Sequence, residues 1–380
     1  RSWSCTHASP IPSAATTMAV NVAAAAAHTG TGRASRNRKK VCSALSLLFM
    51  LPSAVASPMD CDASSAAGTV EPVRLRVGLE WFLNPDHLPL VVALKMGYFE
   101  QANLSVELRV PSDHWEADGE IRNGNIDVAL TEPLHLAQDA AAGRSVVGFS
   151  RFFHTDGGIM FLRESGITRP RDMCGKTISY PGYPGVGGPA IAQTMVEADG
   201  GECDIESYGK HDGGFHHTEA LKSRKADLAT LIFSNFELVE AQHESLNPGF
   251  FSLKEWGVPD FCQLVLFTTP ERFEQLKPAL RRMVLAMRQA VGLIHRNPTS
   301  ALQVYDSYLS SHGGLPTEKT EADKHAATLA ATLPAFPNDN AIAPEYFEEL
   351  MRWLAKTKQV DKIAAAATKP AHYWTNEIAL

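Results

Sequence analysis

Residues 75–101 read LRVGLEWFLNPDHLPLVVALKMGYFEQ, and this stretch sets the pattern for most of the chain. Leu75–Trp81 alternates apolar and polar side chains as a strand does, whereas Leu88–Gln101 spaces its apolar residues as a helix does. Similar runs alternate between strand and helix as far as residue 163. Repeated alternation of this kind is typical of a mainly parallel sheet with helices on both faces.

The pattern starts again at residue 176 and predicts a second lobe. Strands are expected at 176–180, 204–208 and 228–233, and helices at 188–199, 217–223 and 236–243. The apolar strand 261–268 would return the chain to the first lobe, and the sequence after it is helical. We therefore expect an α/β protein that resembles a type II periplasmic-binding-protein fold, with two lobes, mainly parallel sheets and a helical C-terminal tail. In such folds the ligand lies at the carboxyl ends of the strands, between the lobes.

The expected domain boundaries follow from these patterns. They are a leader at 1–56, a linker at 57–72, the first lobe at 73–156, the second lobe at 157–260, and the return and helical tail at 261–380.

The first 56 residues resemble a targeting segment. A basic cluster at 36–40 precedes the apolar run Val41–Leu51, and Ala54–Ala56 offers a small-residue cleavage site. This order is typical of a cleavable secretory signal, so we expect export to a periplasm or into a secretory pathway. A bipartite organelle leader and a buried N-terminal helix are the alternatives.

Charge disfavours one class of partner. The chain has 35 Lys and Arg against 42 Asp and Glu, and the first 56 residues carry six basic residues and no acidic one. The remainder is therefore more acidic than the net charge of −7 suggests. Because an acidic body repels phosphate backbones, we expect no nucleic-acid binding. We also expect a monomer.

The segment Trp81–His87 follows the first expected strand, at the edge where a ligand would lie. Trp81 offers a flat apolar face, and Asn84 offers both a donor and an acceptor. Trp81, Asn84 and His87 are therefore candidate ligand contacts. An ordinary turn between strand and helix is the alternative.

Other expected strands also end at or just before residues that could contact the aromatic ring of a ligand. Glu132 follows the strand at 126–130, Phe233 ends the strand at 228–233, and Glu237 lies in the next helix. A carboxylate can accept hydrogen bonds from an amino-substituted ring, and a phenyl group can stack on it.

A glycine-rich loop follows the first strand of the second lobe. Gly182, Tyr183, Pro184 and Gly185 lie before an expected helix, so backbone N–H groups there could approach an anion. The loop lacks the Lys-Ser/Thr pair of a phosphate-binding P-loop. A tight connection without ligand is the alternative.

Metal binding and nucleophilic catalysis have little support in the sequence. The run from Lys210 to His217 holds three histidines, but His216 and His217 are adjacent and would point in different directions. The serine-hydrolase motif Gly-x-Ser-x-Gly is absent from the sequence. We expect no metal, no cofactor and no catalytic residue. The cysteines form no CxxC pair, and their spacing selects no disulfide.

Several segments resemble one known family. Trp81–His87, Gly97–Phe99, Gly124–Ala129, Gly175–Ile178 and Glu197–Gly201 are similar to motifs of the thiamine-pyrimidine precursor family. That family includes bacterial formylaminopyrimidine-binding proteins, which feed an importer, and fungal pyrimidine synthases. The resemblance covers roughly residues 74–310.

The binding-protein branch implies a small heterocycle in the cleft between the lobes. By resemblance, an aromatic pair stacks on the aminopyrimidine and a glutamate reads its amino group. The residues that match these roles are Trp81, Asn84, Tyr183 and Glu237, with Phe233 where the family commonly has Tyr. An ABC-type permease is the partner that this branch implies.

The synthase branch implies an enzyme that makes the pyrimidine from pyridoxal phosphate and its own histidine, with iron. His135 matches that histidine, and Gly182–Gly185 matches the phosphate loop. The lysine that holds pyridoxal phosphate falls at Thr131, which has no amine for a Schiff base. The cysteine cluster falls at 258–262, where only Phe261 and Cys262 match.

We therefore expect a protein that binds a thiamine pyrimidine precursor for uptake or salvage, without chemistry. A synthase-like transferase is the first alternative. A sulfonate- or nitrate-type binding protein of the same fold is the second.

Overall fold

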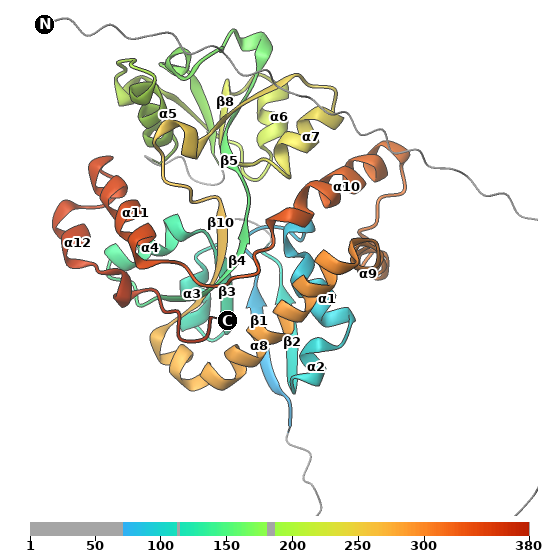
Figure 1. The fold of residues 1–380 in the computed structure, drawn as a ribbon. Helices are drawn as coiled ribbons and strands as arrows, with labels where there is room; N and C mark the ends of the chain where they lie inside the picture. Colours follow the sequence, from blue (N-terminus) through green and yellow to red (C-terminus); the bar gives the residue numbers. More distant parts are fainter. Residues whose placement is uncertain (1–70, 112–114, 181–186, 380) are drawn as a thin grey trace, which may run out of the picture. The chain divides into compact units, whose positions relative to one another are not determined.

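The computed structural model describes residues 71–111, 115–180 and 187–379, which contain two five-stranded sheets (Figure 1). The first sheet, in the order β2-β1-β3-β10-β4, consists of Leu104–Arg109, Val73–Gly78, Val128–Thr131, Gln263–Thr268 and Val147–His154. The second sheet, in the order β7-β6-β8-β5-β9, consists of Gly209–Asp212, Thr177–Tyr180, Leu228–Phe233, Gly157–Leu162 and Pro248–Ser252. The predicted leader, and the linker up to residue 70, lie outside the described residues.

Both sheets are mixed, whereas the sequence predicted mainly parallel ones. In the first sheet β1 runs parallel to β2 and β3, but β10 runs antiparallel to β3 and β4. In the second sheet β6 runs parallel to β7 and β8, but β5 runs antiparallel to β8 and β9. The antiparallel strands β5 and β10 are those that enter each sheet directly from the other lobe. No α-helix lies between β4 and β5 or between β9 and β10. The chain therefore does not cross back to the opposite end of the sheet before β5 or β10 begins, as a crossover between parallel strands would require.

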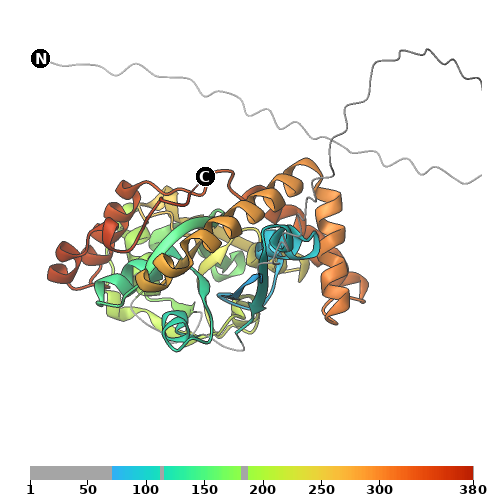
Figure 2. The same ribbon diagram turned by 90° about the horizontal axis from the view of Figure 1, so that it is seen from below.

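Helices cover both sheets. The first lobe carries α1 (Leu88–Lys95), α2 (Tyr98–Gln101), α3 (Ala117–Arg122), α4 (Pro133–Ala141), α8 (Pro270–Arg296) and α9 (Pro298–Ser311), and the second carries α5 (Gly187–Ala198), α6 (His217–Lys222) and α7 (Glu237–His243). The long α8 packs against α1, α2 and α9, and it crosses the view in Figure 2. No helix in the described ranges is both long and apolar enough to span a membrane.

The helical tail contacts both lobes. It consists of α10 (Lys319–Thr332), α11 (Pro344–Lys356) and α12 (Lys362–Ala367). The α10 helix contacts α7 of the second lobe and the turn Pro85–His87 of the first. The α11 helix packs on α4, and its Trp353 donates a hydrogen bond from Nε1 to Oγ1 of Thr194 in α5, at 3.0 Å. The tail therefore ties the lobes together on both flanks.

One predicted strand lies later in the chain. Residues 205–207 form a 3-10 turn rather than part of a strand, and the edge strand is β7. The side chain of Asp204 accepts a hydrogen bond from the backbone N–H of Glu206, which starts that turn. The polar segment after the turn, Gly209–Asp212, pairs with β6.

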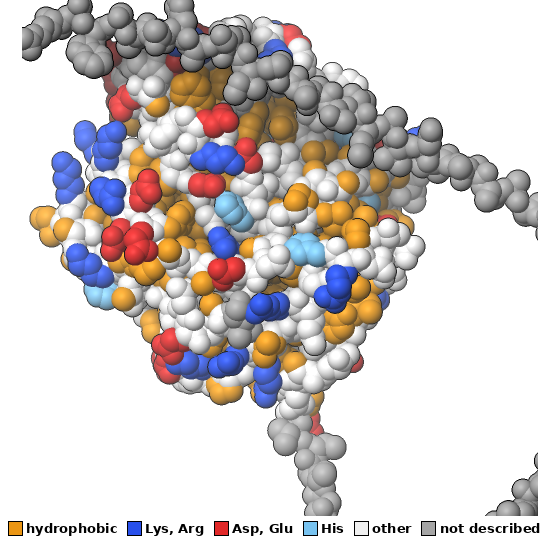
Figure 3. Space-filling view, viewed as in Figure 1, with side chains coloured by type: hydrophobic (Ala, Val, Ile, Leu, Met, Phe, Trp, Pro, Cys, Tyr) orange, Lys and Arg blue, Asp and Glu red, His pale blue; other side chains and the backbone are white. Residues whose placement is uncertain are grey.

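A disulfide joins Cys174 and Cys203 within the second lobe. The remaining cysteine among the described residues, Cys262, is free and buried at the start of the return to the first lobe. On the face drawn in Figure 3, acidic and basic side chains lie interspersed.

Candidate functional site

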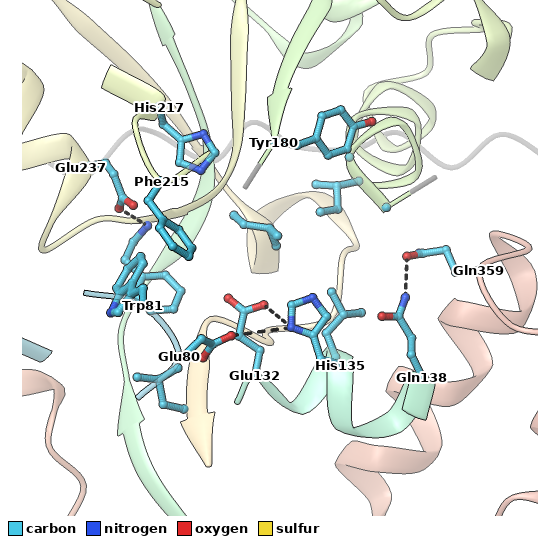
Figure 4. Close-up of a pocket in the computed structure, with 17 residues that line it drawn as sticks. Glu80, Trp81, Glu132, His135, Gln138, Tyr180, Phe215, His217, Glu237 and Gln359 are labelled. Atoms are coloured by element: carbon cyan, nitrogen blue, oxygen red, sulfur yellow. Dashed lines mark hydrogen bonds and ion pairs between the residues drawn. The ribbon is translucent and has the colours of Figure 1, made fainter. Parts of the chain in front are cut away.

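A cavity of about 340 Å³ opens where strand ends of the two sheets face each other (Figure 4). Glu80 and Trp81 follow β1, and Glu132 follows β3, on the first-lobe side. Tyr180 ends β6 and Phe233 ends β8 on the second-lobe side. The volume is in the range of small-molecule sites. The cavity therefore lies where the strand-end rule places a ligand.

Aromatic rings form one wall of this cavity. The ring centroids of Trp81 and Phe233 lie 5.3 Å apart, with an angle of 68° between the ring planes. Phe215, from the loop before α6, lines the same space. Rings set at an angle leave their faces available to a flat guest, which can stack on one and meet the edge of another.

Glu237 begins α7, directly after the turn that follows β8. One carboxylate oxygen, Oε2, accepts a hydrogen bond from the backbone N–H of Phe233 at 2.9 Å, and the residue is only 2 % exposed. Burial raises the pKa of this carboxyl to about 8. At neutral pH Glu237 is therefore mainly protonated, and it can both donate and accept hydrogen bonds.

A second polar group lies at the first-lobe end of the cavity. Nδ1 of His135 lies 3.7 Å from Oε1 of Glu80 and 3.7 Å from Oε2 of Glu132. Burial raises the pKa of Glu132 to about 8, and the nearby carboxylate of Glu80 adds to this rise. Burial alone would lower the pKa of His135, but the two carboxylates outweigh it and raise the pKa to about 9. The His135 side chain is 36 % exposed, so the carboxylates and not burial decide its charge.

Three buried polar atoms of the lining residues have no hydrogen-bond partner among the described residues: Nε1 of Trp81, Oε2 of Glu80 and Oε2 of Glu132. Buried polar groups are normally satisfied, and each exception calls for a partner. One indole N–H group and two carboxyl oxygens around a cavity suit a guest that carries both donors and acceptors.

The described lining of the cavity contains neither Lys nor Arg. Of its two histidines, His217 is buried with its Nδ1 3.2 Å from Oγ of Ser179. Burial lowers the pKa of His217 to about 4, so it is neutral at pH 7. The lining is thus rich in carboxyl groups and offers an anionic guest one cation, His135.

Four of the predicted binding residues share this cavity: Trp81, Glu132, Phe233 and Glu237. His135, named for the synthase alternative, lines it too. The predicted loop Gly182–Gly185, with Tyr183, lies outside the described residues.

Asn84 and His87 do not line the cavity, contrary to the prediction. The side chain of Asn84 accepts a hydrogen bond from the backbone N–H of Asp86 and donates one to the carbonyl of Phe82. Nδ1 of His87 accepts one from the backbone N–H of Asn84 at 3.3 Å. Burial lowers the pKa of His87 to about 3, which keeps it neutral. Both side chains hold the turn that positions Trp81.

Some lining residues were not predicted. They include Glu80, Gln138, Tyr180, Phe215, His217 and Gln359. Glu80 and Tyr180 follow or end strands, so the strand-end rule could have found them. Phe215 and His217 follow β7, which the sequence analysis placed five residues too early. Gln359 comes from the tail after α11, where no strand-end rule applies.

The residues present do not fit a lysine-bound pyridoxal phosphate. Thr131, which the resemblance matches to the lysine, ends β3 and lines a smaller adjoining cavity of about 220 Å³. Neither cavity has a Lys in its described lining. Cys262, which remains from the cysteine cluster, is fully buried, and burial raises its pKa. It is therefore a protonated thiol and a poor metal ligand.

Comparison with known proteins supports the resemblance seen in the sequence. A family model described as NMT1/THI5 like matches residues 84–301, more than half of the chain. Over 305 residues the chain is 29 % identical to a formylaminopyrimidine-binding protein of Halalkalibacterium halodurans, covering 77 % of this chain and 88 % of the relative. Over 252 residues it is 30 % identical to a 4-amino-5-hydroxymethyl-2-methylpyrimidine phosphate synthase of Candida albicans, covering 60 % and 70 % respectively.

Solved structures confirm the predicted fold class. The alkanesulfonate-binding protein SsuA from Xanthomonas axonopodis pv. citri, bound to MOPS, matches with a TM-score of 0.60 at 15 % identity, over 80 % of this chain and 99 % of that one. The periplasmic aliphatic sulphonate-binding protein SsuA from Escherichia coli matches with a TM-score of 0.58 at 13 % identity, over 78 % and 92 %. At such identities the likeness shows a shared periplasmic-binding-protein fold and nothing about the ligand.

Proposed function

Since the chain belongs to the NMT1/THI5-like family, we propose that its cavity binds a thiamine pyrimidine precursor, a small aminopyrimidine, and leaves it chemically unchanged. The observation that carries this proposal is that Trp81 and Glu237 line one cavity, although they come from different lobes. An aromatic face and a buried carboxyl group suit the face and the edge of an aminopyrimidine ring.

The lining favours a pyrimidine over the anions that related folds bind. A sulfonate or nitrate carries a full negative charge, and burying it requires a compensating cation. The described lining supplies one cationic side chain, His135, and its Nδ1 already lies 3.7 Å from a carboxyl oxygen of Glu80 and of Glu132. A neutral or cationic heterocycle needs no such cation, so the sulfonate alternative is disfavoured.

The synthase alternative lacks its covalent anchor. Thr131 has a hydroxyl where a Schiff base needs an amine, so pyridoxal phosphate has no covalent attachment point in the described lining. His135 is paired with Glu80 and Glu132, an arrangement that suits recognition of a ligand. The proposed role is therefore capture by closure of the lobes, not synthesis.

Capture would serve uptake or salvage outside the cytosol. The disulfide between Cys174 and Cys203 supports an oxidising compartment, since such bonds rarely persist in a reducing one. In this role the protein is exported by its N-terminal segment and passes its ligand to an ABC-type permease.

Thermal unfolding with a panel of ligands tests the proposal. The panel is 4-amino-5-hydroxymethyl-2-methylpyrimidine, an alkanesulfonate, nitrate and pyridoxal phosphate. A ligand that binds the native state raises the melting temperature by mass action, so the pyrimidine should raise it and the anions should not. The shift should vanish in Glu237→Ala and persist in Glu206→Ala, a matched change of an exposed glutamate in the same lobe.

Two results would count against the proposal. A shift by the sulfonate alone would assign the protein to the anion-binding group. A visible absorption band from pyridoxal phosphate that survives dialysis and disappears on borohydride reduction would support the synthase instead. The melting temperature of each variant without ligand separates loss of binding from loss of folding.

A further inference from the structure

Glu80, Glu132 and His135 form a compact group at the first-lobe end of the cavity. They come from the ends of β1 and β3 and from α4, so rigid elements hold all three. One nitrogen or oxygen of each lies within 4.8 Å of one of each of the others. In Figure 4 the group lies on the opposite side of the cavity from Glu237. Both Glu237 and this group line the same cavity.

The group has unused hydrogen-bonding capacity. Glu132 is 6 % exposed, and its Oε2 has no hydrogen-bond partner in the described part of the chain. Oε2 of Glu80 is likewise buried without a partner. At 3.7 Å, Nδ1 of His135 is too far from either carboxylate for a hydrogen bond. A donor placed between the carboxylates would satisfy oxygens that the protein leaves unsatisfied.

The charge of the group depends on Glu132, whose pKa burial raises to about 8. Two carboxyl groups face one imidazole, and the adjoining cavity shares Glu80 and His135. That cavity adds Glu116, Asp118 and Asp139. Its one arginine, Arg144, is already paired with these three acids at 3.2, 3.2 and 3.4 Å. If Glu132 ionises, His135 balances one of the two carboxylates of the group, and a cationic ligand would balance the other.

We propose that Glu80 and Glu132, beside His135, bind a protonated primary amine, so that the preferred guest is a 4-aminopyrimidine with an aminomethyl arm. This inference rests on the proposed function and narrows its ligand class. A hydroxymethyl arm donates one hydrogen bond but carries no charge. Formylation removes the positive charge of the amine, and a phosphate group is negatively charged. Charge-assisted hydrogen bonds are roughly twice as strong as neutral ones, which favours the amine.

Proton release gives this proposal a specific signature. Glu132 keeps its proton up to about pH 8 in the empty cavity, and an ammonium group would displace that proton. The other groups near Glu132 are Glu80, His135, Cys262 and Tyr346. Burial raises the pKa values of Cys262 and Tyr346, so both stay neutral in this range. The affinity for the amine should therefore rise from about pH 6.5 to about pH 8, whereas that for a neutral analogue should not.

Isothermal titration calorimetry can compare the 5-aminomethyl and 5-hydroxymethyl derivatives of 4-amino-2-methylpyrimidine. At pH 7 in two buffers of different ionisation enthalpy, we expect the amine to bind about tenfold more tightly and to release close to one proton. Glu132→Gln should remove the preference for the amine and the proton release, and Glu80→Gln should reduce the preference and the proton release. Glu237→Gln is the matched control on the other wall, and it should lower the affinity for the two compounds by the same factor.

The outcomes separate this inference from the function on which it rests. Equal affinity for the two compounds, with no proton release, would overturn the amine subsite and leave pyrimidine binding intact. Binding of neither compound would overturn the proposed function itself. Tight binding of Mn²⁺ or Zn²⁺ to the protein without pyrimidine, lost in Glu132→Gln, would assign the group to a metal ion and also overturn the amine proposal.

Discussion

Nδ2 of Asn235 donates a hydrogen bond to Oδ1 of Asp86 at 2.6 Å and so links the two lobes. Asp86 lies in the turn before α1, and Asn235 follows β8. The same amide nitrogen donates to Oγ1 of Thr332 in α10 at 2.8 Å, so three separate parts of the chain meet in one buried group. This contact lies beside the turn that positions Trp81, and it connects closure of the lobes to the shape of the cavity.

Asn235→Ala should lower the free energy of unfolding by about 1–3 kcal/mol, because it removes a donor from Oγ1 of Thr332 and leaves Oδ1 of Asp86 with only the longer bond from Thr332, at 3.5 Å. Urea denaturation measures the change. Asn125→Ala is the matched control, since Asn125 donates to Glu120 at 2.8 Å on the exposed surface. The free energy of unfolding of Asn125→Ala should lie within about 0.5 kcal/mol of that of the wild type. Equal effects at the two sites would show that the lobes do not depend on the buried contact.

The stability of the protein should fall as pH rises through the titration of Glu237. Its ordinary pKa is 4.5, and burial raises it to about 8 in the folded protein. Between these values the folded state holds a proton that the unfolded state has lost, so rising pH favours unfolding. Because Glu237→Gln cannot titrate, it should gain stability relative to the wild type by about 1 kcal/mol per pH unit from about pH 5 to about pH 7.5.

Denaturation curves at several pH values measure this difference. Glu206→Gln is the control, because it makes the same change at an exposed glutamate of the same lobe. If the difference in free energy of unfolding between Glu237→Gln and the wild type did not change with pH, Glu237 would be ionised in the native protein. The hydrogen-bonding role of the residue would then be that of an acceptor alone.

The periodicity of apolar residues was enough to predict two lobes and a helical tail. It located β1 by the alternation of apolar and polar side chains, and β8 and β10 as largely buried apolar runs; β6 was located as well. It misplaced β7, an edge strand whose polar sequence lacks a strand pattern. It also overstated the parallel pairing, since strand direction depends on which lobe the chain comes from and not on local sequence.

The site was partly predictable for a similar reason. Residues that directly follow buried strands, such as Trp81 and Glu132, could be placed at the ligand edge from the sequence. Asn84 looked equally suitable, but its amide forms hydrogen bonds with the backbone of its own turn, and the sequence pattern does not show this local competition. Gln359 reaches the cavity from more than two hundred residues away, where it accepts a hydrogen bond from Gln138 at 3.3 Å.

Removal of the disulfide should destabilise the second lobe. Cys174 and Cys203 are 29 residues apart, and removing a cross-link that closes a loop of that size costs about 3.6 kcal/mol in the chain-entropy model. Urea denaturation of Cys174→Ser should show this loss without added reductant. Dithiothreitol should bring the wild type to the level of the variant and leave the variant unchanged. If reductant has no effect on the wild type, the bond does not stabilise the fold.

Gly158→Ala should destabilise the protein by about 3 kcal/mol or more, because overpacking against backbone cannot relax cheaply. An added Cβ would lie 2.0 Å from the carbonyl oxygen of Phe251 in the paired strand β9. Gly119→Ala in α3 is the control, since the atom nearest to the added Cβ would lie 3.8 Å away. Alanine is the better helix former there, so the free energy of unfolding of this variant should rise by about 0.5–1 kcal/mol. Similar melting temperatures for the two variants would contradict the tight packing of β5 on β9.

A crystal structure of the protein grown with 4-amino-5-aminomethyl-2-methylpyrimidine tests the central claim most directly. We predict density for one flat ring against Trp81, with Glu237 within hydrogen-bonding distance of the ring and the amine between Glu80 and Glu132. An empty cavity at saturating ligand, or a ring bound elsewhere on the protein, would contradict the account.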